Sequence, residues 1–501
     1  MLIDVTGLTF AYEGSHEPVF ENVSFRMDTR WRLGFTGRNG RGKTTFLRCL
    51  MGELPYSGVI SAPGVRFAYF PVRVGDLSAP TLAALREAAG EVEEWRLLRE
   101  LARLGIPEEL LSRPFSTLSG GEQTRCALAA LFAGEGVFPL IDEPTNHLDM
   151  AARELVGEYL ARKEGFILVS HDRALLDRCT DHTLSINLTD IQITRGSFSV
   201  WWENKKRQDD FERAQDERLR GEIARLEGSA RDRAQWADRA ERAKVGVDRT
   251  KVDNVKGWAP FMGAKAAKQQ RRARAIEERR DRAAEEKAKL LHNIERDEEL
   301  KLTPLTHRAA RLLELRDVSV VYGGRTVTDR LTFELRPGDR LALQGPNGCG
   351  KTSVLRLILG EDVPHTGTVR LASGVRISYV GQDASGLSGS LKDYAGAYGI
   401  DRSVFQTILR KLGFERPQFE KPLEDWPQGQ KKKALLARSL CESAHLYIWD
   451  EPLNYIDVIS RMRIEELLSA CRPTMLLVEH DRAFLENVAT GRVDLSPGPT
   501  P

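Results

Sequence analysis

A phosphate-binding loop pattern occurs twice in this 501-residue chain, and its repetition constrains the fold more than any other feature. The first copy, GRNGRGKTT, spans 37–45, and the second, GPNGCGKTS, spans 345–353. Both match G-x-x-x-x-G-K-[ST] in full. Each follows a strand-like run (WRLGFT, RLALQ) and precedes a helix-like run (TTFLRCLMG, TSVLRLILG). Because this loop needs a strand before it and a helix after it, the sequence predicts two sites for nucleotide phosphates.

The spacing between the two copies is constant. Lys43 and Lys351 are 308 residues apart, and so are Asp142 and Asp450. A shared register at distant landmarks indicates a duplicated domain rather than two independent loops. Strand-like and helix-like segments alternate in both copies, so the expected fold class is α/β with a mainly parallel sheet. The predicted domains are 1–202 and 311–501.

The segment between the copies, 203–310, differs in composition, because Ala, Arg, Glu and Lys dominate it. Leu219, Ile223, Leu226 and Ala230 follow one another at helical spacing. The segment is predicted to be a helical hairpin with arms of roughly 205–245 and 263–301 and a tip at about 246–262, each arm about 60 Å long.

The two phosphate loops define most of the expected nucleotide contacts. Backbone N–H groups at a helix N-terminus surround phosphate oxygens, and the lysine adds a positive charge. The hydroxyls of Thr44 and Thr352 are candidate Mg²⁺ ligands. The expected contact residues are Gly37, Arg38, Asn39, Gly40, Arg41, Gly42, Lys43, Thr44 and Thr45, and Gly345, Pro346, Asn347, Gly348, Cys349, Gly350, Lys351, Thr352 and Ser353.

Two acidic pairs follow apolar strands downstream, in GVFPLIDEP and LYIWDEP. Asp142 and Asp450 are predicted to hold Mg²⁺, directly or through water. Glu143 and Glu451 are placed to polarise the attacking water. Taken alone, such a pair is equally consistent with an exposed acidic strand end, and the phosphate loops favour the catalytic interpretation.

A histidine follows the next apolar strand in each copy. His171 lies in LVSHD and His480 in LVEHD, 309 residues apart. A single histidine at such a place is usually structural, whereas its repetition favours a role near the γ-phosphate.

The segment LSGGEQ, residues 118–123, identifies the class. With the motifs above it resembles the ATP-binding-cassette ATPases, and two cassettes joined by a charged helical linker resemble the ABC-F subfamily. The segments DEPTNHLD (142–149), DEPLNYID (450–457) and GSFSVWWENKK reinforce the resemblance, which covers nearly the whole chain. It implies two ABC-type nucleotide-binding domains joined by an α-helical hairpin, with ATP and Mg²⁺ as cofactors.

The resemblance also assigns contacts outside the phosphate loops. It implies that Ser119, Gly120 and Gly121 of one cassette close over nucleotide held by the other. Tyr12 and Tyr322 match the aromatic position that stacks on adenine, although an ordinary core or surface tyrosine remains an alternative for both.

Two departures from the family pattern fall on one side of the expected head-to-tail arrangement. Gln382 occupies the position of a Mg²⁺-binding glutamine in the second copy, whereas the first copy has Val72 there. The second signature reads WPQGQKKK, in which Pro427 supplies neither a hydroxyl nor an N–H to phosphate, and only Gly429 is retained. The sequence therefore predicts two unequal composite sites. The complete one combines Lys351, Gln382, Glu451 and His480 with Ser119, Gly120 and Gly121, and the defective one combines Lys43, Val72, Glu143 and His171 with Pro427 and Gly429.

Positive charge is concentrated around the predicted tip. The range 244–274 has nine Lys/Arg residues and two Asp residues, while the whole chain carries a net charge of only +2. A solvated coiled-coil face would have a similar composition, but clustered cations beside aromatic residues favour RNA. The candidate contact residues are Lys251, Lys256, Trp258, Phe261, Met262, Lys265, Lys268, Arg271 and Arg272.

The resemblance then implies a function. ABC-F proteins bind the tRNA exit site of the bacterial ribosome, contact large-subunit rRNA and P-site tRNA, and direct the linker towards the peptidyl-transferase centre. MGAKAAKQQRRARA and DEPLNYID look most like the antibiotic-resistance members that act against lincosamides, streptogramin A and pleuromutilins. ATP binding would permit ribosome binding, and hydrolysis would allow release.

Three other readings remain open. They are a housekeeping ABC-F translation factor that rescues stalled ribosomes, an ATPase subunit of a drug exporter, and a DNA-maintenance ATPase with a coiled-coil arm. The chain has no run of 18 apolar residues and no secretory signal pattern, and its six cysteines lack paired spacing. We therefore expect a cytoplasmic, ribosome-associated monomer with an internal pseudo-dimer of cassettes and no membrane partner.

Overall fold

The computed structural model describes residues 1–14, 18–72, 74–90, 92–145, 148–186, 191–245, 271–272, 275–282, 284, 301–414 and 416–496. The chain forms two compact units. One unit contains Met1–Trp201 together with Glu298–Pro501, and the other contains Trp202–Asp297. Both copies of the duplicated domain therefore belong to the same unit, and we call them the first and second cassettes.

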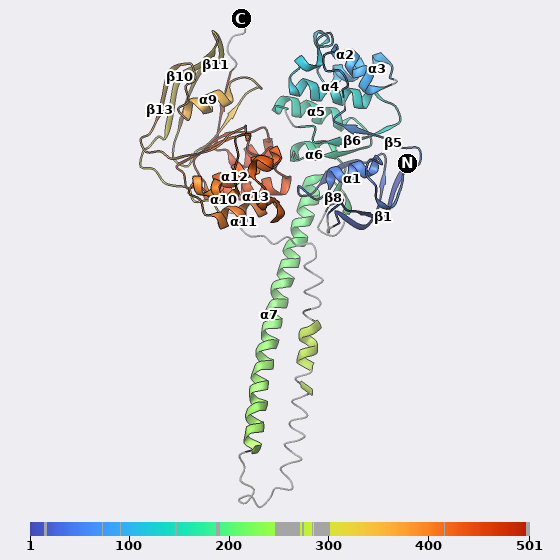
Figure 1. Ribbon diagram of the computed structural model, residues 1–501, viewed down its shortest axis with the longest axis vertical. Coiled ribbons are helices and arrows are strands. Elements are labelled where there is room, and N and C mark those ends of the chain that lie inside the picture. Colours follow the sequence, from blue (N-terminus) through green and yellow to red (C-terminus); the bar gives the residue numbers. More distant parts are fainter. Residues whose placement is uncertain are drawn as a thin grey trace, which may run out of the picture. The chain divides into compact units, whose positions relative to one another are not determined.

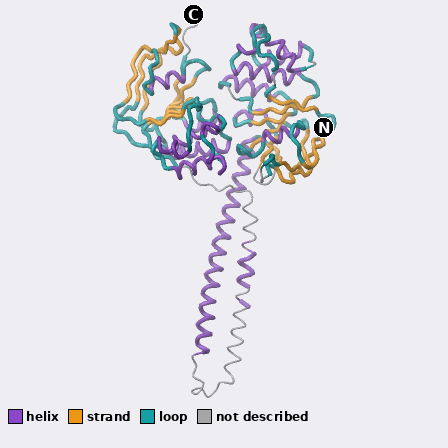
Figure 2. The backbone as a smooth tube through the Cα atoms, in the orientation of Figure 1, coloured by secondary structure: helices purple, strands orange, loops and turns teal. Residues whose placement is uncertain are grey.

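The first cassette contains two sheets (Figures 1 and 2). A three-stranded antiparallel sheet has the order β2-β1-β4, with β1 (Leu2–Phe10), β2 (Phe20–Asp28) and β4 (Ser57–Ser61). A six-stranded sheet has the order β5-β6-β7-β3-β8-β9 and is parallel except for the pair β8 and β9. Its strands are β3 (Arg32–Thr36), β5 (Arg66–Phe70), β6 (Val137–Asp142), β7 (Phe166–Val169), β8 (His182–Ile186) and β9 (Ile191–Arg195).

The second cassette repeats this plan. Its antiparallel sheet has the order β11-β10-β13, with β10 (Leu313–Tyr322), β11 (Arg325–Leu335) and β13 (His365–Leu371). The other sheet is fully parallel and has the order β14-β15-β16-β12-β17. Its strands are β12 (Arg340–Gln344), β14 (Ile377–Val380), β15 (Leu446–Asp450), β16 (Met475–Val478) and β17 (Gly491–Asp494). The predicted α/β class with mainly parallel sheets is confirmed.

Helices alternate with these strands in both cassettes. Those of the first cassette are α1 (Lys43–Leu50), α2 (Thr81–Ala89), α3 (Glu94–Arg103), α4 (Gly120–Ala133), α5 (Met150–Ala161) and α6 (Arg173–Cys179), with 3₁₀ turns η1 (Glu108–Leu110) and η2 (Phe115–Thr117). Those of the second are α9 (Lys351–Ile358), α10 (Leu391–Ala397), α11 (Arg402–Lys411), α12 (Gln428–Cys441), α13 (Val458–Cys471) and α14 (Arg482–Val488), with η3 (Arg416–Glu420) and η4 (Leu423–Asp425).

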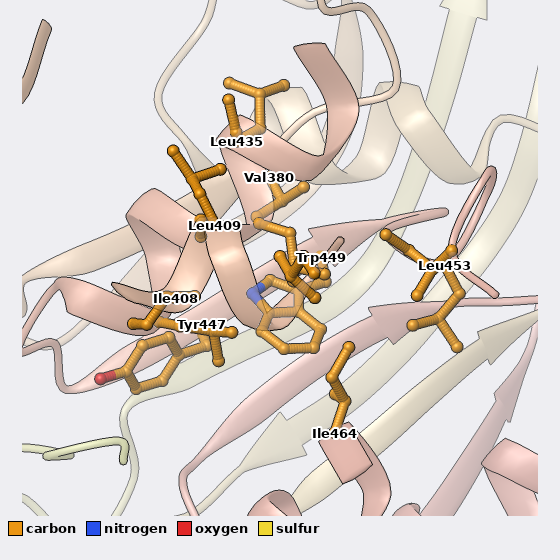
Figure 3. Packing of buried hydrophobic residues seen from close by; sticks show 14 of the residues in the cluster. Val380, Ile408, Leu409, Leu435, Tyr447, Trp449, Leu453 and Ile464 are labelled. Carbon is orange, nitrogen blue, oxygen red and sulfur yellow. The ribbon is translucent and has the colours of Figure 1, made fainter. Parts of the chain in front are cut away.

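The central strands are apolar because both faces of a parallel sheet are covered. All four residues of β7 and of β16 are buried, and so are all five of β15. Figure 3 shows Trp449 and Tyr447 of β15 in one buried cluster with Leu409 of α11. This packing fixes the carboxyl end of β15, where the acidic pair stands.

The helix α7 (Phe198–Val245) begins seven residues before the predicted arm at 205 and ends where that arm was expected to end. In the second predicted arm, residues 271–272, 275–282 and 284 are helical. The predicted tip, 246–262, lies outside the described residues.

The end of the predicted linker belongs to the second cassette. Leu302 is buried in that cassette's core, and the Leu305 N–H donates to the carbonyl oxygen of Ala444 at 2.8 Å. The sequence placed these residues in the linker because apolar periodicity does not reveal which core a short segment joins.

A comparison of Trp449 with Trp95 tests whether the assigned core stabilises the fold. Trp449 is fully buried and donates its indole N–H to Ser439 Oγ at 2.9 Å, whereas Trp95 is 53% exposed. Trp449→Ala should lower the free energy of unfolding by about 3–5 kcal/mol, because it leaves a large cavity. Trp95→Ala should cost less than about 1 kcal/mol. Urea unfolding of the full chain measures both, and equal losses would contradict the assignment of the core.

Candidate functional site

Each phosphate loop joins a central strand to a helix. The first runs from β3 to α1 and the second from β12 to α9. Gly42 and Gly350 precede the helices with φ angles of 90° and 91°, in the left-handed region. A Cβ at Gly42 would lie 2.4 Å from Val19 Cγ1, and one at Gly350 would lie 2.3 Å from Thr328 Oγ1. Both the backbone angle and the close approach therefore require glycine here.

The lysine of each loop is buried and donates to carbonyl groups of its own loop. Lys43 Nζ lies 2.7 Å from the Gly37 oxygen and 3.1 Å from the Arg38 oxygen. Lys351 Nζ lies 2.8 Å from the Gly345 oxygen, in the corresponding arrangement. Burial lowers the pKa of Lys43, against the pull of nearby carboxylates. The ammonium groups thus stand inside the loops, where phosphate oxygens would be neutralised.

A hydroxyl–carboxylate hydrogen bond connects each phosphate loop to another strand of the same sheet. That strand, β6 or β15, lies two positions from the strand that precedes the loop, β3 or β12. Thr44 Oγ1 donates to Asp142 Oδ2 at 2.7 Å, and Thr352 Oγ1 donates to Asp450 Oδ2 at 2.9 Å. In the first cassette Tyr69 also donates to Asp142 Oδ2, at 2.9 Å. Residues 98 positions apart are thereby brought together at the carboxyl ends of parallel strands, where α/β proteins bind ligands.

These residues fit a magnesium ion. Asp450 Oδ1 is buried and has no hydrogen-bond partner in the part of the chain that the structure describes, which leaves a lone pair for a cation or its bound water. Burial raises the pKa of Asp450 to about 6, against the effect of the Thr352 hydrogen bond. A buried carboxylate of this kind is stabilised by a neighbouring positive ion. The hydroxyl and carboxylate oxygens are of the type that Mg²⁺ prefers.

The two glutamates have the same backbone conformation but different surroundings. Glu143 and Glu451 adopt φ angles of 51° and 49°. Burial and the adjacent Asp142 carboxylate raise the pKa of Glu143 to about 7. Burial also acts on Glu451, but His480 and the Asn454 amide, which donates to Glu451 Oε2 at 2.8 Å, outweigh it and lower the pKa to about 2. At neutral pH, Glu451 is therefore fully ionised and Glu143 only partly.

Each predicted histidine lies beside its glutamate. His171 Nε2 is 3.3 Å from Glu143 Oε1 and 3.1 Å from Asn39 Oδ1 of the phosphate loop. His480 Nε2 is 3.6 Å from Glu451 Oε1. Burial lowers the pKa of His171 well below its ordinary value, so its imidazole is neutral.

The two tyrosines lie beside the phosphate loops. The Tyr12 hydroxyl is 2.7 Å from Thr45 Oγ1, and the Tyr322 hydroxyl donates to Ser353 Oγ at 3.3 Å. The side chains are 48% and 43% exposed. Each hydroxyl is held at the first turn of the loop's helix while the ring remains accessible, as stacking on a base requires.

The two signature helices begin differently. In α4, Ser119 caps the helix by accepting from the Glu122 N–H, and the Glu122 carboxylate accepts from the Ser119 N–H, which forms a capping box. In α12, Pro427 occupies the cap position, and no side chain of the described residues caps the helix with a hydrogen bond. The sequence difference between the signatures thus becomes a difference in helix-end geometry.

One signature and the phosphate loop of the other cassette line the same cavity. A cavity of about 610 Å³ is lined by residues of both cassettes. The first cassette contributes Ser119, Gly120, Gly121, Leu148 and Arg153, and the second contributes Val327, Asn347, Gly348, Gly350, Lys351, Thr352, Ser353, Gln382, Lys432, Glu451, Asn454, Tyr455 and His480. The structure therefore brings together the residues that the sequence grouped as the complete composite site.

At the other composite site, Tyr455 contacts both the first phosphate loop and the second signature. The Asn39 side-chain amide of the first phosphate loop donates to the Tyr455 carbonyl oxygen at 2.6 Å. A Cβ at Gly429 would lie 3.1 Å from Tyr455 Cβ, so the second signature packs on the same residue. Tyr455 has a φ angle of 67°, which is strained for a tyrosine. Val72 is half-buried after β5, and its apolar side chain offers no ligand atom.

Several residues around these sites were missed by the sequence reasoning. Arg461 is buried and donates to Asp481 at 2.9 Å, and its counterpart Arg153 contacts Asp172 at 3.3 Å. The signal was available, because these arginines are also 308 residues apart. Lys432 carried no such signal, because Thr124 stands at the corresponding position of the first cassette.

The predicted RNA-contacting residues lie mostly outside the described part of the chain. Lys251, Lys256, Trp258, Phe261, Met262, Lys265 and Lys268 are not described. Arg271 and Arg272 are helical and exposed.

The fold and these sites define a nucleotide hydrolase of the phosphate-loop class with paired cassettes. A family model described as ABC transporter matches residues 20–146 and again 328–454. The two matches cover about half of the chain, and the chain belongs to this family. It is an ATP hydrolase, as predicted. Among the described residues, no helix is long and apolar enough to cross a membrane.

Curated relatives match over almost the whole chain, and they are ABC-F proteins. The ATP-binding protein Uup of Caulobacter vibrioides is 29% identical over 96% of this chain and 75% of its own length. The ribosome protection protein VmlR of Bacillus subtilis is 27% identical over 98% of this chain and 86% of its own length. The predicted resemblance to ABC-F proteins is confirmed.

Solved structures support the fold alone. The archaeal ribosome recycling factor aABCE1 has a TM-score of 0.62 at 18% identity and matches 97% of this chain and 87% of its own. A structure named RNase-L Inhibitor has a TM-score of 0.63 at 18% identity, over 98% of this chain and 90% of its own.

The difference between the glutamates predicts different pH profiles for the two sites. In Glu451→Gln, the remaining hydrolysis depends on Glu143, which is protonated below and ionised above a pKa of about 7. The residual activity should rise about tenfold between about pH 6 and pH 8, because only the carboxylate can polarise water. In Glu143→Gln, Glu451 with its pKa of about 2 stays ionised, and this rise should be absent. Phosphate release measures both, and identical profiles would contradict the prediction.

Proposed function

We propose that the 610 Å³ cavity is the principal site of ATP hydrolysis. In this proposal Lys351 neutralises phosphate charge, and the signature residues Ser119 to Gly121 close over the γ-phosphate from the other cassette. Glu451 is ionised and placed to polarise the attacking water, and His480 beside it contacts the γ-phosphate. Tyr322 stacks on the adenine ring. The observation that supports this most directly is that one cavity contains all the polar groups except the tyrosine.

Magnesium would enter with the nucleotide. The residues that would hold it are Thr352, Asp450 and Gln382, and at the other site Thr44 and Asp142. The ion would neutralise charge on the β- and γ-phosphate oxygens. The unpartnered Asp450 Oδ1 supports this assignment.

We assign the second composite site a slower turnover. It combines the first phosphate loop with the Pro427 signature, and Val72 replaces the glutamine. Because Glu143 is partly protonated at neutral pH, this site polarises the attacking water less effectively. Tyr12 stacks on the adenine there. Equal losses of ATPase activity from Glu143→Gln and Glu451→Gln would contradict this inequality.

For the whole chain we propose an ABC-F ATPase that binds the bacterial ribosome at the tRNA exit site. ATP closes the two cassettes on each other and permits binding, and hydrolysis allows release. The hairpin 203–310, including α7, would contact large-subunit rRNA and P-site tRNA through the cations around its tip. The match to a protein named for ribosome protection, which includes the linker, supports this proposal. In this proposal the chain is cytoplasmic and acts as a monomer, with its two cassettes as an internal pseudo-dimer.

The proposed outcome of ribosome binding is displacement of antibiotics from the peptidyl-transferase region. The apolar tip residues Trp258, Phe261 and Met262 would approach the drug site. A housekeeping translation factor is the second candidate, because the equally extensive match to Uup carries no ribosome-protection name.

Ribosome binding is tested with the double variant Glu143→Gln/Glu451→Gln. Without hydrolysis the closed state should persist, so this variant should co-sediment with bacterial ribosomes in ATP and stay in the supernatant in ADP. The same variant carrying Lys351→Ala, which weakens nucleotide binding at the principal site, is the control and should sediment less. A double variant that remains unbound in ATP would contradict the proposed ribosome partner.

The two candidate outcomes are separated in drug-sensitive bacteria. Expression of the chain should raise the inhibitory concentrations of lincosamides, streptogramin A and pleuromutilins, because the linker tip displaces the drug. The chain lacking Val255–Met262 should bind ribosomes but give no protection. Ribosome binding without any change in inhibitory concentration would favour the housekeeping factor.

A further inference from the structure

Lys432 is a buried lysine in α12 whose ammonium group touches two other elements of the principal site. Its Nζ donates to the carbonyl oxygens of Gly381 at 2.8 Å, Gln382 at 3.3 Å and Asp450 at 3.1 Å. The side chain is 3% exposed. An ammonium group has three N–H donors, and here each has an acceptor.

The three acceptors belong to the two segments that carry the proposed magnesium ligands. Gly381 and Gln382 follow β14, and Asp450 is the last residue of β15. Both Gln382 and Lys432 line the cavity, as does Glu451, which follows Asp450. Lys432 therefore joins the loop of Gln382 to the end of the strand that carries Asp450.

The helix that carries Lys432 is anchored in the core of the second cassette. Ten of the 14 residues of α12 are buried, and Leu435 and Leu436 pack into the core of the second cassette. A side chain anchored on such a helix holds its partners with little freedom, which is what a precisely arranged site needs.

Burial of this ammonium is compensated locally. Burial lowers the pKa of Lys432, and the carboxylates of Asp450, Glu451, Glu479 and Asp383 oppose the shift. The lysine thus also places a positive charge near the acidic pair, in addition to its hydrogen bonds.

Among the described residues of the first cassette, no side chain at this position makes an equivalent connection. Thr124 stands at the corresponding position, and its hydroxyl donates to the Gly120 carbonyl oxygen of its own helix at 2.8 Å. The lysine and the glutamine are thus both present in one cassette, and both are replaced in the other.

We propose that Lys432 is a positioning residue for ATP hydrolysis, whose ammonium group fixes the Gln382 loop against the Asp450 end of β15. This inference rests on the proposed assignment of the cavity as the principal hydrolysis site. Lys432 acts through the backbone of these residues, and its loss leaves the nucleotide-binding loop itself in place.

The test is steady-state ATP hydrolysis by the full chain carrying Lys432→Met, which keeps an unbranched side chain only one atom shorter and removes the three N–H donors. The turnover number should fall on the order of 10- to 100-fold, because misplacement of reacting groups by about 1 Å has effects of this size. The KM for ATP should change less than about threefold, because the phosphate loop is intact. The Mg²⁺ concentration for half-maximal activity should rise.

Two further variants separate positioning from folding. Lys432→Arg, which restores donors and charge, should recover part of the turnover number. Thr124→Val is the matched control in the first cassette and should change the turnover number less than about twofold, since that hydroxyl reaches only its own helix.

Glu451→Gln, measured in parallel, keeps the outcomes distinct. A Glu451→Gln variant with full activity would overturn the assignment of the cavity. An inactive Glu451→Gln variant together with wild-type turnover and magnesium dependence in Lys432→Met would overturn the role of Lys432 alone. Loss of activity in Lys432→Met that matches a loss of thermal stability and is not recovered by Lys432→Arg would also overturn it.

Discussion

The hydrogen bond between a phosphate-loop threonine and the last aspartate of a central strand is the contact around which each nucleotide site is arranged. It joins Thr44 to Asp142 and Thr352 to Asp450. It forms only if two parallel strands on either side of a third, as β3 and β6 are around β7, end at the same edge of the sheet. The adjacent glutamates take a left-handed backbone conformation, and their carboxylates lie 3.3 Å from His171 Nε2 and 3.6 Å from His480 Nε2.

The duplication gives two such arrangements, and small substitutions make them unequal. The start of the serine-capped helix α4 lines the same cavity as the second phosphate loop, while α12 begins after Pro427 without a side-chain cap among the described residues. Burial has the largest effect on the pKa of Glu143 and raises it. For Glu451, His480 and Asn454 outweigh the effect of burial and lower the pKa. The same residue type at the same backbone position thus has opposite tendencies to ionise, because hydrogen bonds to a carboxylate stabilise its charged form.

Much of this was predictable from the sequence. The two loops, the acidic pairs and the histidines were found from pattern and spacing, and the structure places each of them at the carboxyl edge of its sheet. Other features depend on tertiary contacts that leave no recognisable pattern in the sequence, so they could not be predicted from it. Leu302 joins the second cassette, although its neighbourhood in the sequence looks like linker. Tyr455 contacts Asn39 across 416 residues, and Lys432 contacts carbonyl groups, which every residue has.

The sequence by itself determined which residue types are available at each site and in what order, because a phosphate loop is a local motif that carries its own strand, turn and helix. It also determined the inequality of the signatures, since proline lacks an N–H in any fold. Only the tertiary structure decided how these groups are charged and held. Burial, the partner carboxylates and the bridging lysine come from segments far apart in the chain, and their distances are set by the packing of the sheets and helices between them.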